Sequence, residues 1–265
     1  MNTALTGIRG VLLDLDGVVY EGRNVIPEAP RFFERLKRAG WPLQFITNNS
    51  SATPGQFADR LSSMGIGASP DDVLTSAIAT GAYLRARSPQ GGRAFVIGED
   101  GLRQAVWGAG FEITESGVDY VVVGLDHDFD YHKLTVAIRG VLAGATFVGS
   151  NPDTTLPAED GLIPGAGSFQ AAIRAATGVA PIIIGKPEPT MMTMALAKLG
   201  LKPEEAVAIG DRLDTDIVGG HRAGSPTILV LTGISTREQA MLAEIKPTLI
   251  AENLDDVARA IGLPI

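Results

Sequence analysis

Short aliphatic runs alternate with segments of helical periodicity in the first part of the chain. Arg9 to Leu13 is mostly aliphatic, which is typical of a strand buried on both faces. Glu28 to Ala39 has its apolar residues at helical spacing and ends before Gly40. Pro42 to Ile46 is a second aliphatic run, and Thr53-Pro54 starts another helix. This alternation of strand and helix predicts a parallel, doubly wound sheet.

A second series of the same kind occupies the middle of the chain. Val73 to Tyr83 leads into it, and Asn151 to Gly167 is predicted to be a loop because Pro, Gly, Asp and Thr are frequent there. The predicted strands are Arg93 to Gly98, Tyr120 to Gly124 and Thr146 to Gly149, and the predicted helices are Gly101 to Gly108, Tyr131 to Leu142 and Phe169 to Thr177. The middle of the chain therefore forms a second α/β unit with its own apolar pattern.

The first pattern returns after residue 180. The predicted strands are Pro181 to Gly185, Ala206 to Gly210, Pro226 to Leu231 and Thr248 to Ala251, and the predicted helices are Thr190 to Leu199, Asp214 to Ala223 and Leu254 to Ile261. We therefore predict a core domain in two parts, residues 1–77 and 181–265. An α/β domain, residues 78–180, is inserted between them.

Polar residues follow four of the predicted strands. They are Asp14 and Asp16, then Thr47, Asn48 and Asn49, then Lys186, and finally Asp211 with Asp216. The carboxyl ends of parallel strands share one edge of a sheet, which is where open α/β folds bind their ligands. Carboxylates at a buried strand end cost free energy unless they are paired or bind a cation. The four ends together predict a ligand site at this edge.

The residue types in this set suit phosphoryl transfer. Asp14, Asp16 and Asp211 offer the oxygen ligands that Mg²⁺ prefers, with waters and a phosphate completing its coordination. A carboxylate can take the phosphoryl group itself, while a neighbouring carboxylate handles the proton of the leaving group. Donors for the phosphate oxygens are also present, and they are Thr47, Asn48 and Lys186.

Taken in this order, the motifs resemble those of the haloacid dehalogenase superfamily, in its phosphatase branch. The four motifs are Asp14-Leu-Asp16-Gly17-Val18, Thr47 with Asn48-Asn49, Lys186, and Gly210-Asp211 followed by Asp216. The α/β unit between the second and third motifs resembles the NagD-like or p-nitrophenylphosphatase-like subfamily. The local sequences Ile46 to Ser50 and Gly185 to Pro189 resemble that subfamily too. The resemblance covers essentially the whole chain.

The resemblance implies a division of labour among the aspartates. Asp14 would be the nucleophile, and Asp16 the general acid and base. Mg²⁺ would bind the Asp14 carboxylate, the backbone carbonyl of Asp16, and Asp211. The reaction would then pass through an aspartyl-phosphate on Asp14.

The resemblance also implies which residues bind the phosphate. Thr47 and Lys186 would hold it, together with the backbone of Asn48. Asn49 and Asp216 would be supporting residues. For Asp216 three roles stay open: orienting Lys186, orienting the water shell of the metal, or neutralising its surroundings.

The fold implied by the resemblance is a Rossmann-like, doubly wound parallel sheet with an inserted α/β cap domain. Residues near Gly17 to Pro27 would form a mobile flap, and the cap would close over the site. The loop from Asn151 to Gly167 is our candidate for the segment that selects the substrate. Members of the subfamily often form dimers through the cap, so a homodimer is a further expectation.

The function predicted from these motifs is Mg²⁺-dependent hydrolysis of small phosphomonoesters. A phosphomutase or another phosphotransferase would keep every motif residue and stays open as an alternative. A binding module with relic catalytic residues is a third reading, which the intact aspartates and Lys186 argue against. The dehalogenase branch lacks the second aspartate, so Asp16 argues against C–halogen hydrolysis.

Composition and charge limit the classes of molecule that the chain is expected to bind. The chain of 265 residues carries a formal net charge of −8 and no stretch dense in Lys or Arg, so a nucleic-acid polymer is not expected to bind. It has no cysteine and no apolar run near the ~20 residues that span a bilayer. These features favour a cytoplasmic protein without a membrane segment, and a small phosphorylated metabolite as its partner.

Two other segments contain suggestive residue types. Asp126 to His132 holds metal-ligand side chains close together, but nothing in the sequence orients them, so we interpret it as a solvated loop and helix start. Gly161 to Gly167 is rich in glycine but follows no clear strand and lacks a dinucleotide-binding pattern. We interpret it as a loop of the cap.

Overall fold

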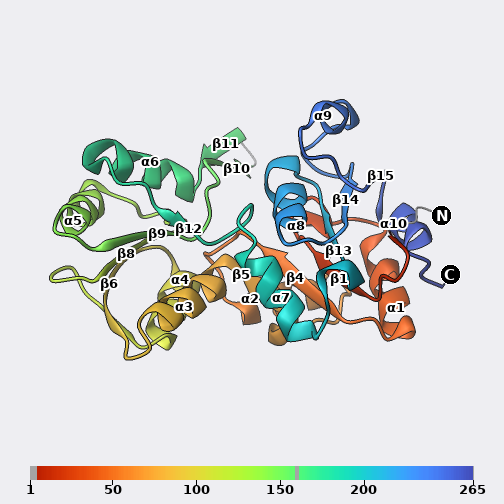
Figure 1. Ribbon diagram of the computed structural model, residues 1–265, viewed down its shortest axis with the longest axis horizontal. Coiled ribbons are helices and arrows are strands. Elements are labelled where there is room, and N and C mark those ends of the chain that lie inside the picture. The colour runs from red at the N-terminus through yellow and green to blue at the C-terminus, as the bar shows by residue number, and fades with distance from the viewer. Residues whose placement is uncertain (1–4, 159–160, 265) are drawn as a thin grey trace. The chain divides into compact units, whose positions relative to one another are not determined.

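The computed structural model describes residues 5–158 and 161–264. The chain divides into two compact units (Figure 1). The first holds the chain up to Thr47, Gly55–Leu74 and the chain from Lys186 onward, and the second holds Asn48–Pro54 and Thr75–Gly185. The predicted domain boundaries, after residues 77 and 180, remain predictions, because a compact unit need not fold on its own.

Strands and helices alternate through most of the chain. In order, the elements are β1 (Gly10–Leu13), β2 (Tyr20–Glu21), β3 (Asn24–Val25), α1 (Ala29–Ala39), β4 (Leu43–Thr47), α2 (Pro54–Ser63), β5 (Val73–Thr75), α3 (Ser76–Arg87), β6 (Gly92–Ile97), α4 (Asp100–Gly108), β7 (Phe111–Ile113), β8 (Tyr120–Val123), α5 (Tyr131–Leu142), β9 (Thr146–Gly149), β10 (Thr155–Ala158), β11 (Gly161–Pro164), α6 (Ala166–Thr177), β12 (Ile182–Ile183), α7 (Thr190–Leu199), β13 (Ala206–Gly210), α8 (Val218–Arg222), β14 (Thr227–Val230), α9 (Arg237–Leu242), β15 (Leu249–Ala251) and α10 (Leu254–Ala260). Short 3₁₀ helices lie at Pro70–Asp72 and Pro203–Glu205, and a π-helical segment, Leu213–Ile217, precedes α8.

A six-stranded sheet has the order β15-β14-β13-β1-β4-β5. Neighbours from β15 to β4 pair in parallel. The central strands β1 and β13 are buried at every residue. Since both of their faces are covered, they are aliphatic throughout and lack the polar alternation of a half-exposed strand.

The chain leaves the centre of this sheet in two directions. From β1 it adds β4 and β5 on one side, and from β13 it adds β14 and β15 on the other. Because strand–helix–strand crossovers are right-handed, the two series place their helices on opposite faces. The predicted doubly wound parallel core is therefore confirmed. Its order reverses between β1 and β13, where folds of this kind open a crevice for ligands.

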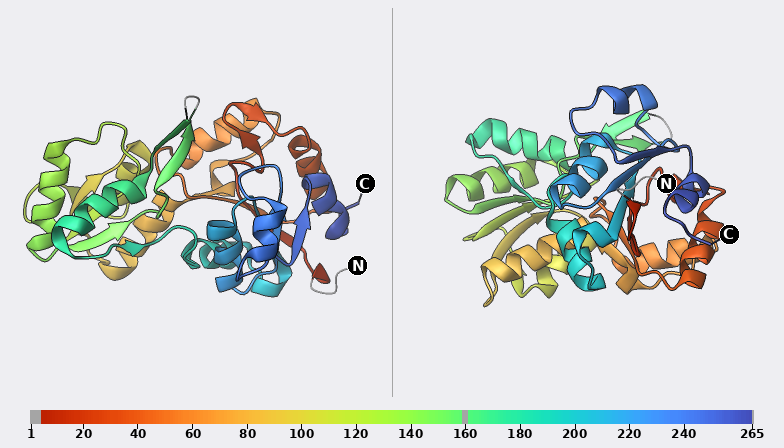
Figure 2. Two further views of the ribbon diagram at one scale, coloured as in Figure 1. Left: turned by 90° about the horizontal axis from the view of Figure 1, so that it is seen from above. Right: turned by 45° about the vertical axis from the view of Figure 1, so that its right-hand side comes forward.

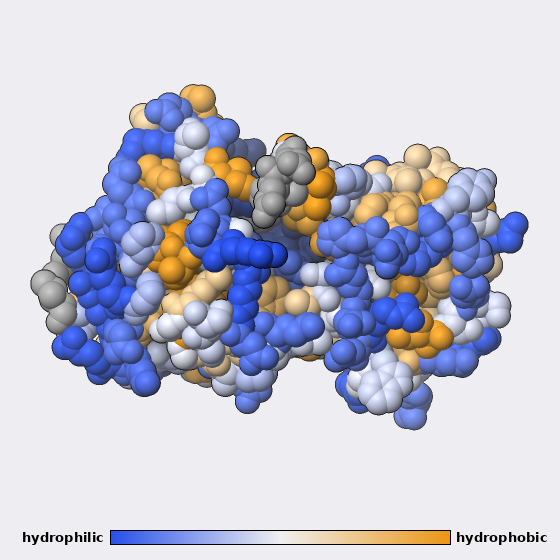
Figure 3. Space-filling view, turned by 180° about the vertical axis from the view of Figure 1, so that it is seen from behind, coloured by the Kyte–Doolittle hydropathy of each residue, from blue (hydrophilic) through white to orange (hydrophobic). Residues whose placement is uncertain are grey.

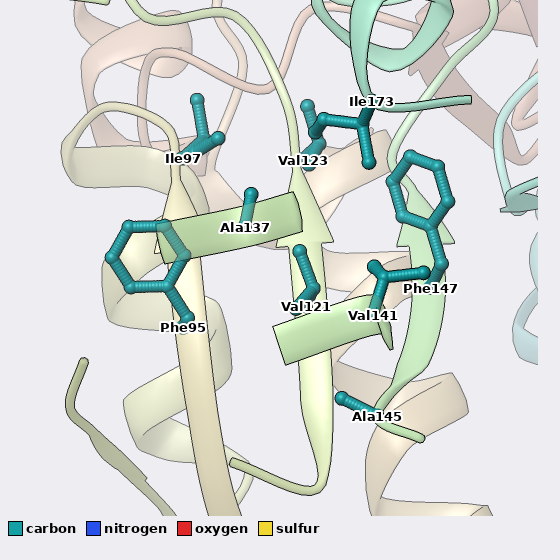
Figure 4. Packing of buried hydrophobic residues seen from close by; sticks show 9 residues of the cluster. All are labelled: Phe95, Ile97, Val121, Val123, Ala137, Val141, Ala145, Phe147 and Ile173. Carbon is teal, nitrogen blue, oxygen red and sulfur yellow. The ribbon is translucent and has the colours of Figure 1, made fainter. Parts of the chain in front are cut away.

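The second unit has a sheet of its own (Figure 2). Its strands are parallel and follow the order β12-β9-β8-β6-β7. Side chains of β6, β8 and β9 face Ala137 and Val141 of α5 and Ile173 of α6 (Figure 4). Phe129 and Phe169 pack against this cluster as a stacked pair with ring centroids 4.3 Å apart. The predicted inserted α/β unit is confirmed.

The strand before Lys186 belongs to a different sheet from the one that the motif analysis assumed. The four strand ends were expected on one edge, but β12 pairs in parallel with β9 of the second sheet, at Ile182 and Ile183. A two-residue strand carries no pattern that tells one sheet from another. Lys186 therefore enters the first unit from the turn ahead of α7 and not from the end of a core strand.

The segment predicted as a loop, Asn151 to Gly167, contains the antiparallel hairpin of β10 and β11, and residues 159–160 lie outside the described residues. Hairpins rich in Thr, Pro and Gly lack the aliphatic run on which the prediction relied. The sequence pattern also did not predict β5, β7, α3 and α9. The three-residue strands are too short to show a period, and α3 contains Thr80 and Gly81, which weaken its helical signal.

Polar residues cover much of the molecular face in Figure 3, with apolar residues scattered among them. Within the described residues, no helix is both long and apolar enough to cross a bilayer.

Candidate active site

Two aspartates follow the two central strands of the first unit. Asp14 comes directly after β1, and its N–H donates to the carbonyl of Ile209 in β13, 2.9 Å away. Asp211 comes directly after β13 and is 2% exposed. The switch point of the sheet, where the strand order reverses between β1 and β13, therefore brings these two carboxylates to one edge.

Lys186 joins this edge as an ammonium group between two carboxylates. Its Nζ lies 2.5 Å from Asp14 Oδ1 and 2.6 Å from Asp216 Oδ1, and it donates to the carbonyl of Ile46 over 3.1 Å. The side chains of Lys186 and Asp216 are 4% and 3% exposed. Burial alone would lower the pKa of Lys186, but Asp14 and Asp216 overcome this and raise it. Lys186 is therefore a fixed positive charge.

Three carboxylates crowd around this one ammonium group. Ligand oxygens of Asp14, Asp211 and Asp216 all lie within 4.8 Å of one another. Burial raises the pKa of Asp14 well above its usual range, and Lys186 only partly opposes this. Burial, followed by the negative charge of Asp216, raises the pKa of Asp211 to about 7. When all three carboxylates are ionised, the site holds more negative charge than Lys186 can neutralise, and this repulsion adds to burial in raising the pKa values of Asp14 and Asp211.

This donor set fits a divalent cation with a preference for oxygen. Within residues 5–158 and 161–264, Asp14, Asp211 and Asp216 are the only group of three or more His, Cys, Asp or Glu side chains close enough together to hold a metal ion. Hard oxygen ligands of this kind suit Mg²⁺. The cluster differs from the predicted metal set, Asp14, Asp16 and Asp211, because it contains Asp216 and not the Asp16 side chain. For Asp16 the prediction concerned its backbone carbonyl.

Two glycines distant in sequence, Gly17 and Gly233, allow the backbone to pack closely around Asp211. Gly17 has a φ of +76°, and a Cβ there would lie 2.5 Å from Asp211 Oδ2. A Cβ at Gly233 would also collide with the Asp211 carboxylate. Both glycines let the backbone approach this side chain, so they shape the site although they carry no functional group.

The loop after β14 holds Asp211 in place, and the sequence analysis did not find it. The N–H of Ile234 donates to Asp211 Oδ2 over 2.8 Å, and the N–H of Ser235 donates to the Asp211 carbonyl over 3.0 Å. The Thr232 hydroxyl donates to the carbonyl of Gly17 over 2.6 Å. The one available signal was the Thr232-Gly233 pair directly after a predicted strand, which is also an ordinary turn sequence.

Asp16 lies in a tight turn beside this cluster. The N–H of Gly17 donates to the carbonyl of Tyr20 over 2.8 Å, and the N–H of Val19 donates to that of Leu15 over the same distance. Dehydration raises the pKa of Asp16, while Arg60 and then Lys186 oppose the shift. A carboxyl group whose pKa is raised holds its proton more readily, which suits a proton donor.

The second motif divides between the two units. Thr47 is the last residue of β4 and is 2% exposed, in the first unit. Asn48 opens the second unit, where its carbonyl accepts from the Ser76 hydroxyl at 2.6 Å and from Asn151 Nδ2 at 2.7 Å. The Oδ1 of Asn49 accepts from the N–H of Ser51 at 2.9 Å, a local turn contact. The structure therefore gathers Asp14, Lys186, Asp211 and Asp216. The contacts of Asn48 and Asn49 described above lie within the second unit.

The segment Asp126 to His132 has structural partners for its acidic and basic groups. The Asp126 carboxylate pairs with Lys133 at 2.8 Å, and the Asp130 side chain accepts from the N–H of Lys133 at the start of α5. His127 and His132 pair with Glu99 and Glu115 respectively. The interpretation of this segment as a loop and helix start is confirmed, but Asp126 is buried and not solvated.

Family profiles and relatives match most of the chain. A profile described as haloacid dehalogenase-like hydrolase matches residues 11–112, and one described as HAD-hydrolase-like matches residues 183–257. An acid sugar phosphatase from Staphylococcus aureus is 43% identical over 249 residues, which make up 94% of this chain and 96% of that protein.

Solved structures of high similarity agree with these matches. A 4-nitrophenylphosphatase from Thermotoga maritima is 35% identical with a TM-score of 0.92, over 97% of this chain and 99% of that one. NagD from E. coli K-12 is 34% identical with a TM-score of 0.88, over 94% of this chain and 98% of that one.

Proposed function

Because the chain belongs to the haloacid dehalogenase-like hydrolases, in the group of NagD and the p-nitrophenylphosphatases, we propose that it hydrolyses small phosphomonoesters through an aspartyl-phosphate on Asp14. The resemblance predicted from the motifs is thereby confirmed, and the chain is a phosphatase. The observation that carries the proposed mechanism is the buried pairing of Lys186 with Asp14, beside Asp211 and Asp216 at the switch point of the sheet.

In the first proposed step Asp14 attacks phosphorus. A bond forms between the carboxylate oxygen and phosphorus, and the bond to the leaving oxygen breaks with its electron pair. Asp16 gives its proton to that oxygen, so an alcohol departs and not an alkoxide. In this proposal Lys186 stabilises the charge that builds on the peripheral phosphate oxygens, and Thr47, the last residue of β4, assists it.

In the second proposed step water releases the phosphate. Asp16, now ionised, takes a proton from a water molecule whose oxygen bonds to phosphorus. The bond between phosphorus and Asp14 breaks, and both aspartates return to their starting states. The aspartyl-phosphate thus divides one difficult displacement into two easier ones.

The residues that would hold Mg²⁺ are Asp14 and Asp211, with the backbone carbonyl of Asp16 and support from Asp216. The ion would supply positive charge against the incoming phosphate, which three crowded carboxylates would otherwise repel. Lys186 neutralises only part of that charge, so we infer that the metal-free site binds phosphate poorly.

The substrate class follows from the relatives. Their names describe an acid sugar phosphatase and a 4-nitrophenylphosphatase, so we propose sugar phosphates and p-nitrophenyl phosphate as substrates of this chain. The cytoplasmic location and the homodimer through the cap remain predictions. So does the selection of substrates by the segment from Asn151 to Gly167.

The proposal is tested by measuring phosphate release from p-nitrophenyl phosphate and a panel of sugar phosphates, with Mg²⁺ or with EDTA. We expect release only with Mg²⁺, and a loss of at least about 1,000-fold in Asp14→Asn. Asp59→Asn, an exposed carboxylate of α2 in the same unit, is the matched control and should keep wild-type activity. Full activity in Asp14→Asn would remove this residue as the nucleophile. Transfer to an added alcohol without free phosphate would favour the phosphotransferase alternative.

A further inference from the structure

Arg60 of α2 contacts the short β2–β3 hairpin, which follows the turn that carries Asp16. Its guanidinium carbon lies 3.9 Å from the centre of the Tyr20 ring in β2. Its Nη2 also donates to the carbonyl of Gly22, the residue at the hairpin bend. One side chain therefore touches both the strand and the turn of this hairpin.

The hairpin is joined to Asp16 by short backbone contacts. Asp16 and Tyr20 form an isolated bridge, and the N–H of Gly17 donates to the carbonyl of Tyr20 over 2.8 Å. The N–H of Ile26, just past β3, donates to the carbonyl of Val19 over 2.9 Å. Because these contacts span only a few residues, a shift of Tyr20 moves the turn that carries Asp16.

The Tyr20 ring is fixed by packing and by the cation, and not by its hydroxyl. Tyr20 is completely buried, yet among the described residues its hydroxyl has no hydrogen-bond partner. A cation over an aromatic ring is attracted more strongly when both are shielded from water. Arg60 is partly buried, so its contact with the ring benefits from this shielding.

We propose that Arg60 is a positioning residue, which holds the β2–β3 hairpin and thereby keeps Asp16 aligned for proton transfer. This inference rests on the proposed function, because it assigns Asp16 the role of proton donor. Arg60 itself touches no reacting atom in this assignment. Its planar guanidinium can lie over a ring while one N–H reaches a carbonyl, which a lysine ammonium cannot match in both respects.

The first test follows the hairpin without any enzyme assay. Arg23 lies exposed at the bend, between β2 and β3, where trypsin can cut the chain. We expect Arg60→Met to speed cleavage after Arg23 by about fivefold or more, because the hairpin opens more often. Arg38→Ala, which removes an exposed arginine of α1 in the same unit, should leave that rate unchanged. Equal rates in wild type and Arg60→Met would overturn the proposal.

The second test separates alignment of Asp16 from general damage. Phenyl phosphate and p-nitrophenyl phosphate have nearly the same shape, but the phenolate of the former leaves less readily and needs the proton more. The first burst of released phenol or nitrophenol reports transfer of the phosphoryl group to Asp14, and Arg60→Met should slow this burst about tenfold on phenyl phosphate and less than about threefold on p-nitrophenyl phosphate. KM should change less than about twofold for both. Arg60→Lys should recover part of the loss, since it keeps the charge over the ring.

The outcomes distinguish the inference from the function on which it rests. Equal losses on the two esters, or a change confined to KM, would show that Arg60 does not align the proton donor. If wild type releases no phosphate from either ester, the proposed function fails, while the trypsin experiment still decides whether Arg60 holds the hairpin. Arg60→Met keeps an apolar stem over Tyr20, and Arg60→Lys serves as the milder variant if that protein is poorly folded.

Discussion

Asp216 joins the buried ammonium group of Lys186 to the backbone that follows β13. Its Oδ1 pairs with Lys186 at 2.6 Å, and its Oδ2 accepts from the N–H of Arg212 at 3.1 Å. Of the three roles left open by the sequence, the geometry favours orientation of Lys186. Sequence alone could not choose among them, because the spacing from Asp211 does not tell which lysine folds against this carboxylate.

Removing the Asp216 carboxylate should destabilise the protein. In Asp216→Ala, Lys186 keeps Asp14 but loses one buried partner, so we expect the free energy of unfolding to fall by about 3 kcal/mol. Asp214→Ala is the matched control two residues earlier, since Asp214 is 70% exposed and its ion pair with Arg212 lies at the surface. That change should cost less than about 1 kcal/mol. Urea denaturation of both variants measures the difference, and equal losses would contradict this account.

Asp16 can be tested by the quality of the leaving group. Asp16→Asn cannot give a proton, so the first step, transfer of the phosphoryl group from phenyl phosphate to Asp14, should slow about 100-fold or more. With p-nitrophenyl phosphate the first step should slow less than about tenfold, because the departing oxygen needs little help. The first burst of released phenol or nitrophenol measures this step, while steady-state turnover should fall on both esters because Asp16 also activates the water of the second step. Equal slowing of the first step on both esters would assign Asp16 a role other than proton donor.

At the scale of elements, the helices and strands with the clearest residue patterns were predicted most accurately from the sequence. α5 and α7 coincide with their predictions, and β13 does as well, because each has a full period or a full aliphatic run. β12 shows the limit of this reasoning. Its two residues look like any buried strand, and only tertiary packing places them beside β9 and not in the core sheet.

Phe147 of β9 tests the packing of the second unit. It is 2% exposed and lies in the cluster between the sheet and helices α5 and α6 (Figure 4). Phe147→Ala should lower the free energy of unfolding of this unit by about 3 kcal/mol or more, because a ring-sized cavity cannot fully close. Leu142→Ala, at a position 65% exposed, should change it by less than about 0.5 kcal/mol. Denaturation followed by circular dichroism measures whether Phe147→Ala lowers the free energy of unfolding by this amount.

At the scale of the whole molecule, the order of strands explains why a large part of the candidate site could be predicted from the sequence. The four motifs are distant in sequence, yet β1 and β13 meet at the switch point and bring Asp14 and Asp211 together. The sequence did not reveal the loop around Gly233 or the contacts of Arg60. Both depend on backbone carbonyls and amides of other segments, which leave no pattern of residue types.

The crowded carboxylates should make the metal-free protein less stable as pH rises. The pKa of Asp211 is about 7 in the folded state, well above its ordinary value, so between about pH 4 and pH 7 the folded state keeps a proton that the unfolded state has lost. The free energy of unfolding in EDTA should therefore fall across this range, by up to about 1.4 kcal/mol per pH unit from this group. Asp211→Asn should flatten the slope. An unchanged slope in that variant would exclude Asp211 as its source.

The central claim, that Asp14 receives the phosphoryl group, is tested most directly by trapping the intermediate. Wild-type protein with Mg²⁺ and p-nitrophenyl phosphate would be quenched in acid within the first turnover, digested, and analysed by mass spectrometry. We predict that the peptide containing Asp14 gains the mass of one phosphoryl group, and that Asp14→Asn shows no such gain. A phosphoryl group on any other residue, or phosphate release with full turnover in Asp14→Asn, would contradict the account.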